Sequence, residues 1–142
     1  MRIRAPCGAA VAGIVFTLVA LSLADQAHAV VQEPHWVLVQ VNGVDWKFRV
    51  DANNIKALGS KREFWLKTEF PKGYPTALAI QHAVMDCDKD TLTEDDGSTT
   101  PINPDVAYLV SIEQFVCGSE QYRRDVERYS RNWEMEHGGK VK

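Results

Sequence analysis

The sequence predicts an α+β domain in which a small antiparallel β-sheet of four to six strands is followed by helices. Two observations favour this class. Between residues 35 and 88, β-branched and aromatic residues alternate with polar ones, and the runs are broken by Gly, Pro and Asn; this pattern is typical of short, half-buried strands. From residue 103 onward the apolar residues recur at helical spacing instead.

The first two strands are predicted to form a hairpin. Residues 35–41 (HWVLVQV) are β-branched and apolar, and Asn42-Gly43 is a strong tight-turn signal. The next segment alternates apolar and charged residues, as a strand with one buried face does. The alternating residues are Trp46, Phe48 and Val50 against Asp45, Lys47 and Arg49.

The remaining strands follow a connecting loop at residues 51–60. Residues 62–70 alternate again, with Phe64 on one face and Trp65 on the other, and residues 71–75 (PKGYP) form a turn. Residues 76–88 are a long candidate strand, although their interior would also suit a helix; the flanking prolines and the order of elements favour the strand. Residues 90–100 are acidic and threonine-rich, which fits either a short exposed edge strand or a loop.

Two helices are predicted at the C-terminal end. Asn103 is a candidate N-cap with Pro104 at the first helical position, and an apolar stripe extends from Tyr108 to Val116. Gly118-Ser119 then provides both a stop and a new cap. A second, more polar helix follows. Its stripe consists of Tyr122, Val126, Tyr129 and Trp133.

The first 29 residues are predicted to be a signal peptide. Arg2 and Arg4 precede an apolar run at residues 9–24, and the small-x-small motif Ala27-His28-Ala29 follows. The alternative, a membrane-spanning helix, needs about 20 apolar residues and this run is shorter. Cys7 lies before the run, so it does not match a lipid-anchoring cysteine. We therefore expect an exported protein, in the periplasm or at the cell surface, that is not lipid-anchored.

Composition limits the classes of partner and chemistry. The formal net charge is −3, and a mildly acidic chain argues against nucleic acid as a main partner. His35, His82 and His137 are widely separated, no catalytic motif is present, and the acidic run at residues 86–97 lacks the Gly and Glu that an EF-hand requires. We therefore expect no metal site, no cofactor and no enzymatic activity.

The expected mature chain retains two cysteines, Cys87 and Cys117. An even number of cysteines in an exported chain favours a structural disulfide, which would close a loop of about 31 residues and contribute on the order of 3–4 kcal/mol. A redox pair or metal ligation remains the alternative, but there is no C-x-x-C spacing. Because Cys87 lies at the end of a predicted strand and Cys117 ends a predicted helix, the bond would hold that helix against the sheet.

Exposed aromatic residues are the candidate binding surface. Tyr74 lies in a predicted turn, whereas Trp46 and Trp65, at strand spacing, are more often core residues than contact residues. The second helix carries a stripe that would serve either as a packing face within the domain or as a contact in a homodimer. The candidate surface residues are Tyr74, Tyr122, Tyr129 and Trp133.

A series of residues runs in a distinctive order between Trp36 and Cys117: Trp36 with its apolar strand, Val50-Asp51 with Ile55, Trp65-x-Lys67, Tyr74, Asp86-Cys87, Gly97, Ile102-x-Pro104 and Val116-Cys117. This series resembles the surface-adhesin protein E family of small exported bacterial proteins. The resemblance implies a small antiparallel sheet with a helix tied to it by a disulfide. It also implies binding of host matrix proteins, because the named member of the family is an adhesin that binds them. This chain differs from the pattern in having Asp105-Val106 after Pro104 and in its helical tail.

The expected organisation is therefore a signal peptide at residues 1–29, an adhesin E-like domain at 30–118 and a C-terminal helical extension at 119–142. The expected function is that of an exported, non-enzymatic, adhesin-like binding protein, with a host matrix protein or an envelope protein as partner. The alternative is a periplasmic structural or stress-related accessory protein that has no host ligand. Fold resemblance alone does not decide between them.

Overall fold

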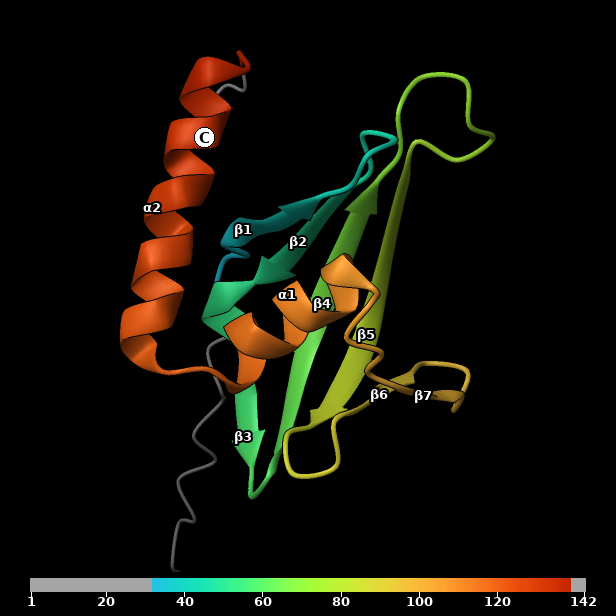
Figure 1. The fold of residues 1–142 in the computed structure, drawn as a ribbon, viewed down its shortest axis with the longest axis vertical. Coiled ribbons are helices and arrows are strands. Elements are labelled where there is room, and N and C mark those ends of the chain that lie inside the picture. Colours follow the sequence, from blue (N-terminus) through green and yellow to red (C-terminus); the bar gives the residue numbers. More distant parts are fainter. Residues whose placement is uncertain (1–31, 139–142) are drawn as a thin grey trace, which may run out of the picture.

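The computed structural model describes residues 32–138, so the predicted signal peptide lies outside the described residues. These residues form a seven-stranded antiparallel sheet with two α-helices (Figure 1). The strand order is β1-β2-β4-β5-β6-β7, and β3 also pairs with β4. The elements are β1 (Trp36–Val41), β2 (Lys47–Asp51), the 3₁₀ turn η1 (Ala52–Asn54), β3 (Lys56–Leu58), β4 (Lys61–Glu69), β5 (Leu78–Asp86), β6 (Thr91–Glu94), β7 (Thr99–Pro101), α1 (Ala107–Cys117) and α2 (Glu120–Glu136).

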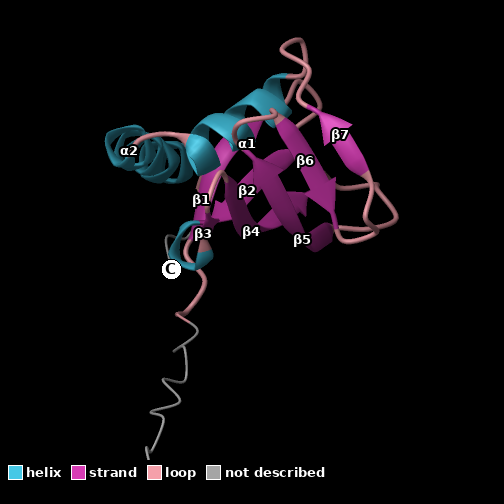
Figure 2. Cartoon of the chain, turned by 90° about the horizontal axis from the view of Figure 1, so that it is seen from below, coloured by secondary structure: helices cyan, strands magenta, loops and turns pink. Residues whose placement is uncertain are grey.

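One face of the sheet forms the hydrophobic core together with α1. Strand side chains alternate between faces, and the alternation places Phe48, Phe64 and Met85 on the same side as α1, all buried. The helix contributes its own buried stripe. That stripe consists of Leu109, Ile112, Phe115 and Val116. In Figure 2, α1 lies across this face and α2 lies beside the β1 end of the sheet. On the opposite face, α2 contacts Leu38, Lys47 and Arg49 at the β1–β2 end, whereas neither α-helix covers the β4–β5 part.

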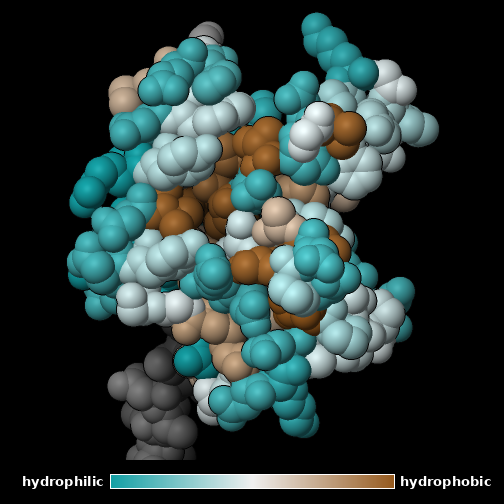
Figure 3. Space-filling view, in the orientation of Figure 1, coloured by the Kyte–Doolittle hydropathy of each residue, from teal (hydrophilic) through white to brown (hydrophobic). Residues whose placement is uncertain are grey.

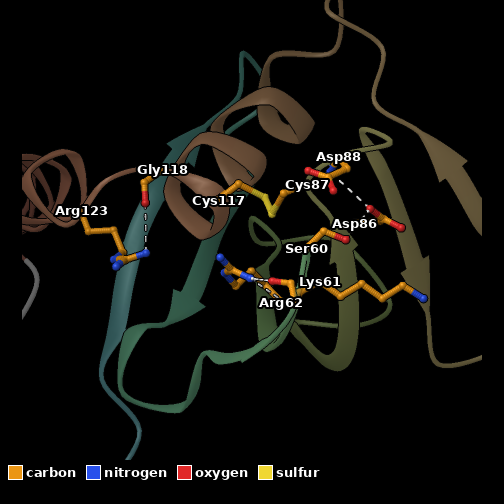
Figure 4. Close-up of a disulfide and its surroundings, with 10 residues drawn as sticks. Ser60, Lys61, Arg62, Asp86, Cys87, Asp88, Cys117, Gly118 and Arg123 are labelled. Atoms are coloured by element: carbon orange, nitrogen blue, oxygen red, sulfur yellow. Dashed lines mark hydrogen bonds between the residues drawn. A yellow bond between two sulfur atoms is a disulfide. The ribbon is translucent and has the colours of Figure 1, made fainter.

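A disulfide fixes α1 to the sheet as predicted. Cys87 directly follows β5, Cys117 is the last residue of α1, and their Cα atoms are 5.7 Å apart. Figure 4 shows the two side chains meeting between the helix and the strand end. Cys87 is also held through its backbone, because its N–H donates to the carbonyl of Ser60 at 3.0 Å. The predicted α+β fold with a disulfide-tied helix and a C-terminal helix is thus confirmed.

The C-terminal helix α2 lies along the outer edge of the sheet. Ser119 caps it as predicted, its side chain accepting a hydrogen bond from the N–H of Tyr122 at 3.2 Å. The buried Ser130 hydroxyl accepts the N–H of Leu38 at 2.9 Å, so α2 satisfies a donor that edge strand β1 would otherwise leave open. None of the helices among residues 32–138 is long and apolar enough to span a bilayer.

Three details differ from the sequence-based expectations. The predicted loop at residues 51–60 contains η1 and the short strand β3, and the acidic segment forms both β6 and β7, so the sheet has seven strands rather than four to six. Trp46 precedes β2 instead of lying within it, because Asn42 Oδ1 accepts its N–H at 2.9 Å and lengthens the turn. Helix α1 starts at Ala107: the Asn103 side chain accepts the N–H of Asp105 in a local turn and does not cap the helix.

Candidate functional site

The sheet face that points away from α1 is the candidate site, and we call it the open face. Register places its side chains in four neighbouring strands. They are Trp36 and Leu38 on β1; Lys47 and Arg49 on β2; Glu63, Trp65, Lys67 and Glu69 on β4; and Leu78, Ile80 and His82 on β5. Leu38 is fully buried at the end where α2 packs. The β4–β5 part of this face is open because α1 lies on the other side of the sheet and α2 reaches only the β1–β2 end (Figure 2).

Large apolar side chains lie exposed at the centre of this face. Trp65 is 43% exposed, and its diagonal neighbour on β5, Ile80, is 52% exposed. Leu78, 45% exposed, is the next residue of β5 on the same face. The ring of His82 packs edge-on against Trp65, with ring centroids 5.2 Å apart. Single exposed apolar residues are ordinary, but a contiguous group on one face indicates an interaction surface.

A hollow of about 480 Å³ lies beside this apolar centre. Trp36, Trp65 and Ile80 form its apolar wall, and Asp51 and Glu63 are among its polar lining residues. The Asp51 carboxylate has a structural role, because its Oδ1 accepts a hydrogen bond from the N–H of His35 at 3.0 Å. The hollow therefore offers apolar contact with a few polar groups at its rim, which suits an inserted side chain of a partner.

Charged residues form an ordered network on the α2 side of the open face. The Arg49 guanidinium pairs with Glu69 at 2.9 Å and also with Glu134 of α2, and Lys67 pairs with Glu69 at 3.2 Å. Burial raises the pKa of Glu69, but the ion pairs with Arg49 and Lys67 outweigh it, so the pKa lies below its ordinary value of 4.5. The Lys67 ammonium also lies 4.9 Å from the ring centroid of Trp36. Both signs of charge are thus held beside the apolar centre.

The acidic β6–β7 turn borders the other end of the face. Asp95 Oδ2 accepts the backbone N–H of His82 at 2.9 Å, and Asp95 Oδ1 lies 3.6 Å from the His82 ring nitrogen Nδ1. Gln81 donates to the neighbouring Glu94 at 2.7 Å. These contacts hold the turn against the middle of β5, where β6 has already ended.

The four aromatic residues predicted as a binding surface do not form one patch. Tyr74 lies in the β4–β5 loop and packs on Trp46, with ring centroids 5.6 Å apart. Tyr122 lies in the first turn of α2, and its hydroxyl donates to Gln114 of α1 at 3.0 Å. Tyr129, in the middle of α2, is exposed.

Trp133, near the end of α2, is half-buried: it stacks on His137 at a centroid distance of 4.2 Å, and the Lys47 ammonium lies 5.0 Å from its ring centroid. Along α2 about 16 Å separates Tyr122 from Trp133. Figure 3, which is seen from the α1 side, shows mainly hydrophilic colour along α2 and hydrophobic surface between α2 and the rest of the domain. Trp133 therefore packs against the domain, and Tyr129 remains exposed on a polar helix.

The residues that could carry catalysis or bind a metal are dispersed. Among residues 32–138 no group of three or more His, Cys, Asp or Glu side chains is placed to hold a metal ion. The buried Asp86 carboxylate is used structurally, since it accepts from the Ser60 hydroxyl and from the N–H of Asp88. Trp65 was expected to be a core residue and Ile80 was not predicted as a site residue, because alternation shows that a strand has two faces without showing which face is covered.

Comparisons with protein families, curated proteins and solved structures found no match for this chain.

Proposed function

We propose that this protein is an exported, non-enzymatic, adhesin-like binding protein of the bacterial envelope, and that the open face is its binding surface. The observation that carries the proposal is the exposed apolar group of Trp65, Ile80 and Leu78 on β4 and β5, where neither α-helix covers the open face. Export is supported by the leader pattern in residues 1–29. The intramolecular disulfide is consistent with an oxidising compartment.

The chemistry of the open face favours a protein as partner. Exposed tryptophan beside an apolar hollow is the usual anchor of a protein interface, and charged residues at the rim improve specificity and association rate. Here Lys67 and Glu69 supply both signs of charge next to the anchor. A nucleic acid would instead require clustered basic residues, and the chain has a net charge of −3.

Binding of immobilised host matrix proteins, such as fibronectin, laminin and collagen, tests this proposal. Trp65→Ala should weaken capture at least about tenfold, which corresponds to roughly 1.4 kcal/mol. Tyr129→Ala is the matched control, because Tyr129 is an exposed aromatic on α2 and not on the open face. If Tyr129→Ala weakens capture and Trp65→Ala does not, the helix and not the open face is the binding surface.

The second candidate is a periplasmic accessory protein with an envelope partner and no host ligand. The observation that favours it is that Cys7 precedes the apolar run, so no lipid anchor is expected. Intact mass, measured separately on periplasm, outer membrane and medium, separates the two. A mass of Val30–Lys142 less two hydrogens in the periplasm alone supports the accessory role, whereas the same mass at the surface supports adhesion. A full-length mass contradicts leader removal in both.

A further inference from the structure

Strand β5 is only half paired on its outer side. It comprises Leu78–Asp86 and pairs with β4 along its whole length, whereas β6 pairs only with residues 83–86. In Figure 1 the upper half of β5 lies at the margin of the sheet, above β6 and β7. Within the described part of the chain, residues 78–82 thus have a strand neighbour on one side only.

Register shows which backbone groups of this half-strand point outward. Two backbone hydrogen bonds flank the β4–β5 ladder, from Phe70 N–H to Ala77 O and from Cys87 N–H to Ser60 O. Because hydrogen-bonded pairs alternate along an antiparallel ladder, the odd-numbered residues of β5 bond to β4. The even-numbered residues face the other way. This agrees with the backbone N–H of His82, which donates outward to Asp95. The N–H and C=O groups of Leu78 and Ile80 are therefore the free groups of this edge.

The same two residues also present exposed apolar side chains. Leu78 and Ile80 lie on the open face, about half exposed, in the strand next to Trp65. Proteins protect open edges with proline, charge or a covering element. Edge strand β7 contains Pro101 and β1 has its Leu38 N–H bonded to α2, but residues 78–82 (LAIQH) contain neither proline nor a charged lysine, arginine or acid.

Charge at one end of this edge indicates what would bind there. The β6–β7 turn holds Glu94 and Asp95 against Gln81 and His82 at this end of the edge, and Asp96 is the next residue of the turn. Hydrogen bonds from the side chain and backbone of Ser98 lower the pKa of Asp96, so this residue stays ionised. An added strand that is antiparallel to β5, like every pair in this sheet, would have its N-terminal end at this acidic turn.

We propose that the free edge of β5 at Leu78–Gln81 binds an extended segment of a partner protein, with basic residues at its N-terminal end followed by alternating apolar residues, as an additional antiparallel strand. Backbone hydrogen bonds to Leu78 and Ile80 supply affinity, and the apolar side chains that share their face contact the open face around Trp65. The inference rests on the proposed function, because it specifies how the same surface engages its protein partner.

The probe is the synthetic amidated peptide Lys-Lys-Val-Thr-Val-Thr-Val-Thr, added to protein purified after expression of the full chain. Residue-resolved amide hydrogen exchange is the readout. In the free protein the amides of Leu78 and Ile80 should exchange rapidly, whereas those of Ala79 and Gln81 should be protected by their hydrogen bonds to β4. Millimolar peptide should slow exchange at Leu78 and Ile80 by at least tenfold and leave Ala79 and Gln81 unchanged. Absence of this protection overturns the proposal.

Two matched peptides distinguish strand addition from side-chain binding. In the added strand, the peptide valines have their side chains on the open face and their N–H groups directed at β5. N-methylation of the valines should therefore abolish binding. N-methylation of the threonines places the methyl groups on the outer side and should leave binding intact. Equal binding of the two peptides, with chemical shift changes at Trp65 but no protection at Ile80, overturns strand addition while leaving the open face as a binding surface.

The variant Ile80→Pro removes the outward N–H without removing a hydrogen bond to β4. It should lose peptide binding while Tyr129→Ala retains it. If Ile80→Pro does not fold, the peptide pair and the exchange measurement on the unaltered protein still decide the question. A different result would contradict the proposed function: Trp65→Ala would then leave capture of matrix and envelope proteins unchanged.

Discussion

Arg49 of β2 forms an ion pair with Glu134 of α2, and this contact joins the C-terminal helix to the open face of the sheet. The same guanidinium pairs with Glu69 of β4 at 2.9 Å, and its side chain is only 10% exposed. An arginine presents its donors in a planar fork, so it can bond two carboxylates at once. The helical tail is thus fixed by a charged residue in the sheet as well as by apolar packing.

Replacing Arg49 should destabilise the domain strongly. Arg49→Met leaves Glu69 and Glu134 close together without their shared cation, and loss of one partner of a buried ion pair costs about 3–5 kcal/mol. The free energy of unfolding from urea titration measures the loss. The double variant Arg49→Met with Glu134→Gln should lose less free energy of unfolding than the sum of the two single variants, because the side chains share one network.

The exposed pair Arg124–Glu120 on α2 is the control for this prediction, with an N–O distance of 2.8 Å. Both side chains are largely in solvent, so Arg124→Met should change the free energy of unfolding by less than about 1 kcal/mol. Equal losses for Arg49→Met and Arg124→Met would show that Arg49 contributes no more than a surface charge.

The disulfide should account for a large share of the stability. Cys87 and Cys117 are 30 residues apart in the sequence, and closing such a loop contributes on the order of 3–4 kcal/mol in the chain-entropy model. Cys87→Ser and Cys117→Ser should each lose this amount, and the double variant should lose no more, since one bond is removed in all three. Urea unfolding with and without reductant measures it. A larger loss in the double variant would show that each cysteine also contributes separately.

Glu113 of α1 should make stability depend on pH. Burial, reinforced by the nearby Asp90 carboxyl, raises the pKa of Glu113 above its ordinary value of 4.5. The folded state therefore binds the proton more tightly, and this contribution is present below the unfolded pKa and lost as pH rises through the folded pKa. Glu113→Gln should raise the melting temperature at neutral pH and give no gain below the ordinary glutamate pKa.

Glu120→Gln is the matched control for the pH dependence. Glu120 lies in the first turn of α2 and pairs with Arg124, so its charge is favourable to the helix dipole. Its replacement should lower the melting temperature slightly at neutral pH, opposite in sign to Glu113→Gln. A neutral-pH gain from both variants would indicate a general effect of removing negative charge.

The sequence was sufficient to predict most elements, because their signals are local. Alternation in β4 placed Phe64 and Trp65 on opposite faces of the strand, and the Ser119 cap located the start of α2. The start of α1 was predicted too early because Asn103 and Pro104 have the composition of a helix cap. In the structure the Asn103 side chain bonds within its own turn instead.

The candidate site was harder to predict, because it depends on what the neighbouring elements leave uncovered. The exposure of Trp65 follows from α1 covering the opposite face, and the free edge at Ile80 follows from β6 ending at Glu94. Neither condition can be predicted from the residues of β4 or β5 alone. The aromatic residues of α2 were more conspicuous in the sequence, but Trp133 is partly engaged by Lys47 and His137.

The adjacent residues Phe64 and Trp65 should separate stability from binding. Phe64 is fully buried beneath α1 and Trp65 is substantially exposed on the open face. Phe64→Ala leaves a cavity in the core and should lower the free energy of unfolding by about 3–5 kcal/mol. Trp65→Ala removes mostly surface contacts and should cost far less, on the order of 1 kcal/mol, while weakening partner capture. Urea titration and capture on the same two variants test this. If Trp65→Ala costs as much stability as Phe64→Ala, its indole supports the fold and its exposure is not evidence of a binding surface.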